Sequence, residues 1–237
     1  MVLVVAAAAA LAAAVLQEDG DMETLAKEFL TASEQQAVTS EVQKAERETS
    51  GEIVPLIISA SHHYPMAAVR GATLMAMPFA LICTSQLGSS LWTGSDNMYL
   101  FVFFFALFYL PLRFVVNRSV KLKRQFLSAR EIEEEVEEAA ITSFYGEGLY
   151  RTREENGIII FISVLEQKVW ILGDKGINDK INPAEWENIV NELIQGIKSG
   201  NQGDALCMAV RQVGGILKTH FPYRRDDTDE LHNLIIR

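Results

Sequence analysis

An apolar block from Gly71 to Val116, broken once between Trp92 and Asn97, constrains this chain more than any other feature. Both halves of the block are free of charged residues over nearly their whole length. Each half approaches the roughly 20 residues that a helix needs to cross a hydrocarbon core of about 30 Å. Because the polar break consists of turn formers, the block predicts a transmembrane helical hairpin with spans at about residues 71–91 and 98–116.

Two buried helices of a soluble core are the alternative interpretation of this block. The consecutive side chains Phe103, Phe104 and Phe105 disfavour it, because together they face every direction around a helix. Apolar side chains on all sides are typical of a helix surrounded by lipid.

Positive charge flanks the block but is absent from its break. Arg70 precedes the first span, and a basic cluster follows the second, comprising Arg113, Arg118, Lys121, Lys123 and Arg124. Because Lys and Arg remain on the cytoplasmic side, we expect a multi-pass protein of the cytoplasmic (inner) membrane. The soluble domain would then be cytoplasmic and the loop 92–97 external, with membrane lipid headgroups as partners of the basic cluster.

The composition excludes one class of function. The net charge of −10 argues against a general nucleic-acid binder, since phosphate contacts need a basic face. The two cysteines, Cys83 and Cys207, share no motif that indicates a disulfide or a metal pair, which suits a reducing compartment.

The polar segments predict alternating helices and strands. Ser33 followed by Gln36 fits a capping box for a helix that Gly51 would stop. The run 52–59 is typical of a buried strand, with Pro55 indicating an edge or a distortion. Beyond the hairpin we expect one long helix to about Gly146, a β-hairpin at 157–164 and 168–172, and helices starting near Pro183 and Gly203.

Two stretches resemble a known family. They are Thr49-Ser50-Gly51-Glu52-Ile53 and FYGEGLYRTREENGIIIFISVLEQKVWILGDKGIN, which spans residues 144–178. Their order is similar to that of TPM-domain proteins, in particular the bacterial membrane-protein branch, over about residues 31–59 and 137–219. The resemblance implies an α/β fold, an α/β/α sandwich with an inserted two-helix transmembrane hairpin. It also implies relatives with acid-phosphatase activity or calcium binding, although their plan has an exported domain and a terminal anchor.

The insertion divides the expected domain into two parts. Residues 1–21 are an apolar leader or start-site artefact, with a signal peptide and a third span left open. The tail is expected to fray unless it docks on the domain or a partner. The remaining segments are 22–65 (first part of the TPM-like domain), 66–117 (hairpin), 118–220 (second part) and 221–237 (tail).

Polar side chains collect at the ends of the predicted strands. The resemblance assigns a metal or phosphate site to Thr152, Asn156 and Asp174, with Glu52 as a further member. Calcium or another divalent cation would be the cofactor, since hard cations bind several carboxylate and carbonyl oxygens. The alternative is that Asn156 and Asp174 shape turns through local hydrogen bonds.

No motif identifies a nucleophile or a cofactor. His62 and His63 point to opposite faces of an extended segment, so they do not form a metal pair, and we expect them at the membrane interface. The six glutamates between 131 and 138 predict a solvated helix face.

Two functions remain from the sequence. The preferred one is a membrane-embedded interaction, assembly or regulatory module, with a membrane protein or a second copy as partner. The other is a metal-dependent phosphatase that uses the strand-end carboxylates.

Overall fold

The computed structural model describes residues 24–90, 97–152, 154–223 and 231–237. The chain forms two compact units. Among the described residues, the first comprises His63–Ile132, and the second joins residues 24–62 to those after Ile132. The expected leader at 1–21 and most of the expected loop at 92–97 lie outside the described residues.

The second unit is built on a mixed sheet with the strand order β3-β2-β1-β4. Strand β1 (Glu52–Ile58) pairs in parallel with β2 (Gly157–Ser163), and Glu52 lies opposite Gly157. Strand β3 (Lys168–Gly173) is antiparallel to β2, which confirms the predicted β-hairpin. The strand before the insertion and the strands after it therefore share one sheet.

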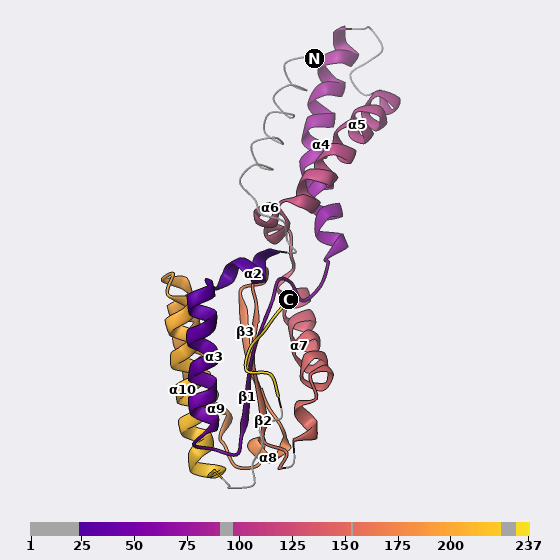
Figure 1. Cartoon of the computed structure of the whole chain (residues 1–237). Coiled ribbons are helices and arrows are strands. Elements are labelled where there is room, and N and C mark those ends of the chain that lie inside the picture. The colour runs from indigo at the N-terminus through magenta and orange to yellow at the C-terminus, as the bar shows by residue number, and fades with distance from the viewer. Residues whose placement is uncertain (1–23, 91–96, 153, 224–230) are drawn as a thin grey trace. The chain divides into compact units, whose positions relative to one another are not determined.

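Helices cover both faces of this sheet, which confirms the α/β/α sandwich (Figure 1). On one face lie α3 (Ala32–Glu46), α9 (Pro183–Lys198) and α10 (Gln202–His220), whose apolar side chains pack with Ile53, Ile57 and the even-numbered isoleucines of β2. On the other face lies α7 (Ala129–Gly146), which buries Val136, Ala140 and Phe144.

Local signals set the starts of two helices. Asn182 caps α9 and Pro183 occupies its first turn, as predicted. The capping box of α3 is instead formed by Thr31 and Glu34, so the prediction of Ser33 with Gln36 is wrong. Glu34 Oε2 accepts a hydrogen bond from Thr31 N at 2.8 Å, and the carboxylate gives this box a charged acceptor near the helix N-terminus.

The C-terminal residues complete the sheet. Ile235–Ile236 form β4, parallel to β1, and Arg237 N donates to Ile57 O at 3.0 Å. The expected fraying of the tail is therefore wrong for residues 231–237. Ile57 and Ser59 form backbone hydrogen bonds on the side of β1 that faces β4. Pro55, which has no N–H, faces the same side and precedes the two residues that pair with β4.

The first unit contains α4 (Pro65–Ser90) and α5 (Met98–Arg118), both long and apolar enough to cross a membrane. The two helices contact each other through small and aromatic side chains, including Ala76, Ala80, Phe104 and Phe108. The side chain of Asn97 caps α5, because its Oδ1 accepts hydrogen bonds from the backbone amides of Tyr99 and Leu100. Most of the remaining apolar side chains of both helices are exposed.

The expected single helix after the second span is broken, so that prediction is wrong. Ser119 ends α5 and caps the short helix α6 (Val120–Gln125), its hydroxyl accepting from Leu122 N at 3.2 Å. A second break at residues 126–128 precedes α7. Serine competes for backbone hydrogen bonds, so it starts a new helix where the periodicity suggested continuation.

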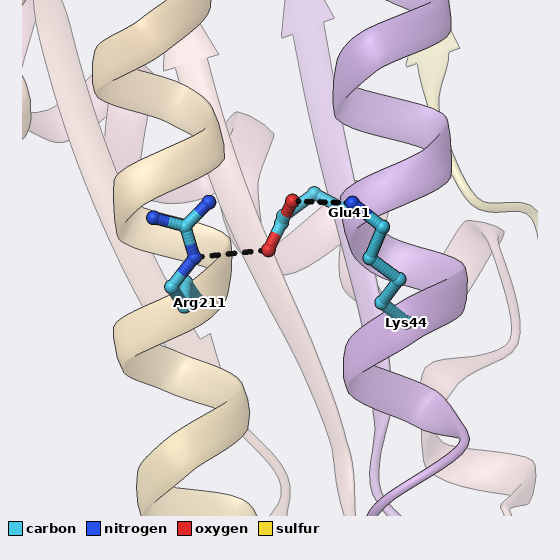
Figure 2. Close-up of polar contacts among 3 residues, drawn as sticks. All are labelled: Glu41, Lys44 and Arg211. Atoms are coloured by element: carbon cyan, nitrogen blue, oxygen red, sulfur yellow. Dashed lines mark hydrogen bonds and ion pairs between the residues drawn. The ribbon is translucent and has the colours of Figure 1, made fainter.

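A carboxylate bridges α3 and α10 on the surface of the second unit (Figure 2). Arg211 Nε donates to Glu41 Oε1 at 3.0 Å, and Lys44 Nζ lies 3.2 Å from Glu41 Oε2. The Arg211 hydrogen bond lowers the pKa of Glu41, against the opposing effect of burial, and Lys44 adds to the lowering.

Glu41→Gln tests this bridge. A lowered folded-state pKa means that Glu41 stabilises the fold above its unfolded-state pKa of about 4.3, and that this contribution is lost as the pH falls through the folded-state value. We expect the variant to lose about 0.5–1 kcal/mol of unfolding free energy at neutral pH and nothing in acid, by denaturation in detergent. Glu187→Gln, on the exposed face of α9, is the matched control. An equal loss at both pH values would contradict the expectation.

Candidate functional site

The residues predicted for the site lie at one edge of the sheet. Glu52 begins β1, Asn156 directly precedes β2, and Asp174 directly follows β3. Thr152 ends the short 3-10 turn η2 (Leu149–Arg151) that leads into this edge. Because β1 and β2 are parallel and β3 is antiparallel to them, this edge holds the amino ends of two strands and the carboxyl end of the third.

Asn156 connects the entries of the two parallel strands. Its side chain is buried, with 2% exposed, and Nδ2 donates to the Ser50 carbonyl at 2.6 Å. The backbone N–H of Asn156 donates to Thr152 Oγ1 at 3.1 Å. Thr152 and Asn156 therefore form hydrogen bonds that shape the loop before β2 and tie it to the segment before β1.

Ser50 is the partner that sequence reasoning missed. It belongs to the Thr49-Ser50-Gly51 stretch, and its hydroxyl also lies 3.2 Å from Glu154 Oε2. The signal was present in that stretch, but a partner 106 residues away along the chain cannot be read from local spacing.

One carboxylate oxygen of Asp174 accepts a hydrogen bond, and the other accepts none from the described residues. Oδ1 accepts from Lys175 N at 2.7 Å at the start of the short helix α8 (Lys175–Asn178), whereas Oδ2 is buried without a hydrogen-bond partner among the described residues. Gly176 lets this turn approach the preceding loop, since a Cβ there would lie 2.7 Å from the Glu155 carbonyl oxygen. Asp174 thus shapes a turn and also presents a bare carboxylate oxygen.

Glu52 is buried at the same edge, with 5% of the residue exposed. Glycine is required beside it in the sheet, because a Cβ on Gly157 would lie 2.6 Å from the Leu149 carbonyl oxygen. The turn residue Glu155 has a φ of 52°, an unusual value for a side chain other than glycine. The loop before β2 is therefore closely fitted to the strand that follows it.

These oxygens do not make up a complete cation site. Calcium needs about six to eight oxygen ligands. Thr152 Oγ1 and Asp174 Oδ1 already accept backbone hydrogen bonds. Within the described parts of the chain, no three His, Cys, Asp or Glu side chains gather closely enough to hold a metal ion.

A second polar cluster lies at the opposite edge, where β1 leaves the sheet. Glu166, in the β2–β3 turn, accepts from Ser61 N at 2.9 Å and from the Ser163 hydroxyl, and the Ser61 hydroxyl donates to Ser163 Oγ at 3.0 Å. Glu166 is buried, with 5% exposed. This cluster holds the segment that follows β1, and no sequence motif indicated it.

His62 follows this cluster and pairs with α7. Its Nδ1 lies 3.2 Å from Glu135 Oε2, so one of the six glutamates expected on a solvated face has a partner. Glu131 likewise bonds Arg70 within the first unit, and the Arg70 hydrogen bond lowers the pKa of Glu131. Glu133, Glu134, Glu137 and Glu138 are exposed.

Comparison with known proteins supports the resemblance. Residues 125–216 match the family model of the TPM domain. The fold is similar to the NMR structure of the BA42 protein from the psychrophilic bacterium Bizionia argentinensis, with a TM-score of 0.53 and 23% sequence identity, over 87% of this chain and 94% of that chain. No curated protein matches the chain.

Asn156→Ala tests the connection between the strand entries. The variant leaves the buried Ser50 carbonyl without its donor, so we expect a loss of about 1–3 kcal/mol in unfolding free energy. Urea denaturation in detergent, followed by tryptophan fluorescence, measures it. Asn188→Ala, on the exposed face of α9, is the control, and equal stability of the two variants would contradict the structural role of Asn156.

Proposed function

Because the chain carries a TPM domain, matched over residues 125–216, we propose that it is a membrane-anchored interaction module. The α4–α5 hairpin holds the TPM domain at the bilayer, and the domain binds or regulates another membrane component. Assembly or regulation of a membrane protein is the role that this arrangement suits.

The outward apolar surface of the hairpin carries the proposal. Leu74 is 64% exposed, Phe103 59% and Leu110 67%. A core helix of a soluble protein would bury such side chains, whereas lipid solvates them without cost. Helix α5, with 21 residues, is about 31 Å long, which equals the thickness of a hydrocarbon core.

The way in which the chain enters and leaves the hairpin supports anchoring. Helix α4 begins shortly after β1 ends, and β1 pairs directly with β2, which lies beyond the hairpin in the sequence. Both ends of the hairpin therefore continue into one folded domain. The segment that follows β1 is held to the β2–β3 turn by the hydrogen bonds among Ser61, Ser163 and Glu166.

The metal-dependent phosphatase is the rival function. Its support is the bare oxygen of Asp174 at the sheet edge. Phosphoryl transfer to water also needs a nucleophile or a metal-activated water. The described residues around Asp174 supply hydrogen bonds that shape turns, which favours the interaction module.

Cysteine labelling in intact cells tests the orientation. In a background with Cys83→Ala and Cys207→Ser, we expect Ser90→Cys to react with an impermeant maleimide from outside and Glu138→Cys to react only after permeabilisation. The physical reason is the basic cluster that follows α5. The reverse pattern would place the TPM domain outside.

Cross-linking followed by purification in mild detergent tests the interaction. We expect the wild-type chain to recover a membrane-protein partner or a second copy, and a version with charged residues at Leu74, Phe103 and Leu110 to lose membrane association. Recovery of the protein alone would count against the module.

Assays with phosphomonoesters, with and without divalent cations, separate the rival. We expect no turnover that depends on Asp174. Turnover that disappears in a folded Asp174→Ala variant would establish the phosphatase instead.

A further inference from the structure

Four exposed cationic side chains surround one end of the hairpin. They are Arg113 and Arg118 on α5 and Lys121 and Arg124 on α6, and we call them the basic collar. The apolar helices contain no Lys or Arg between residues 71 and 112. Positive charge is therefore concentrated at one end of the spans.

The other cations at this end are engaged inside the unit. Arg70 bonds Glu131 and donates to the Phe126 carbonyl at 3.2 Å. Lys123 is buried, with 2% exposed. By contrast, Arg113, Arg118 and Arg124 form no ion pair with any residue that the structure describes. These three arginines of the collar thus present their charge outward, whereas Arg70 and Lys123 do not.

The collar is held in a fixed geometry. Ser119 N donates to Val115 O at 2.9 Å and its side chain caps α6, so the chain turns sharply between Arg118 and Lys121. Helix α6 contacts both α4 and α5. Phe126 packs against α4 at Gly71, where a Cβ would lie 2.6 Å from the Phe126 ring.

Apolar side chains lie directly beside these cations. Leu110 is 67% exposed and Phe114 is 62% exposed on the same last turns of α5 as Arg113. Arg113 lies five residues before Arg118, about 7.5 Å along the axis, and its long side chain can reach the charged level while its stem covers apolar surface. A ligand that contacts both the cations and the neighbouring apolar side chains combines a negatively charged group with acyl chains.

We propose that the basic collar binds the phosphate headgroups of anionic phospholipids in the leaflet at this end of the hairpin. Arginine suits phosphate because its guanidinium donates two parallel hydrogen bonds. The chain as a whole carries a net charge of −10, so the collar offsets repulsion from an anionic bilayer at the point of contact. This inference rests on the proposed insertion of the hairpin into a membrane.

The test uses the full chain in nanodiscs of phosphatidylcholine with a minority of phosphatidylglycerol. The protein is extracted in mild detergent, and mass spectrometry measures the ratio of the two lipids that remain bound. We expect phosphatidylglycerol to be enriched on the wild-type chain. Arg124→Gln should reduce the enrichment by up to about fivefold, and Arg113→Gln/Arg118→Gln/Arg124→Gln should return the ratio to that of the bulk lipid.

A matched control removes the same charge elsewhere. Arg47→Gln/Lys168→Gln/Lys198→Gln changes three exposed cations of the other unit and should leave the enrichment unchanged. Circular dichroism checks that each variant is folded, and the single Arg124→Gln variant, at an exposed position of α6, serves if the triple variant is not.

Three results would overturn the inference. They are a wild-type ratio equal to the bulk, an equal effect of the control variant, and release of the lipid by inorganic phosphate alone, which would indicate a free-phosphate site. Failure of the chain to enter nanodiscs of pure phosphatidylcholine would instead refute the hairpin insertion itself. Entry without enrichment refutes only the lipid preference.

Discussion

The parallel pairing of β1 with β2 is the interaction on which the other features depend. Strand β1 precedes the hairpin and β2 follows it, so this ladder joins the two parts of the chain in one sheet. It brings Ser50 next to Asn156 at one edge and Ser61 next to Ser163 at the other. Each edge is closed by buried side-chain hydrogen bonds that exist only when this register is formed.

The two edges differ in what they offer. At the amino end of β1 and β2, the hydrogen bonds fix loops, and Oδ2 of Asp174 is buried without a hydrogen-bond partner among the described residues. At the carboxyl end, Glu166 is used to hold the exit towards the hairpin. The buried polar side chains at both edges therefore mainly hold segments of the chain in position.

The sequence predicted the features that local patterns encode. The apolar runs of α4 and α5, the β-hairpin of β2 and β3, and the Pro183 start of α9 follow from composition and turn chemistry. The pairing of Ile235 and the Glu166 cluster depend on contacts between distant residues, which no local pattern carries. The start of α3 was a choice between two local patterns, since Thr31 with Glu34 fits a capping box as well as Ser33 with Gln36 does. For the site, the sequence predicted residues that gather at one edge, whereas their hydrogen-bond roles required Ser50.

The inserted hairpin also determines the order in which this protein can be made. During synthesis β1 emerges first, but its partner β2 follows only after α4, α5, α6 and α7. Pairing between distant strands is slow because the intervening chain must be closed into a loop. Helix α3 and β1 must therefore remain without their sheet until the residues that follow α7 have been made. Until then the apolar strand β1 lacks its parallel partner in the nascent chain.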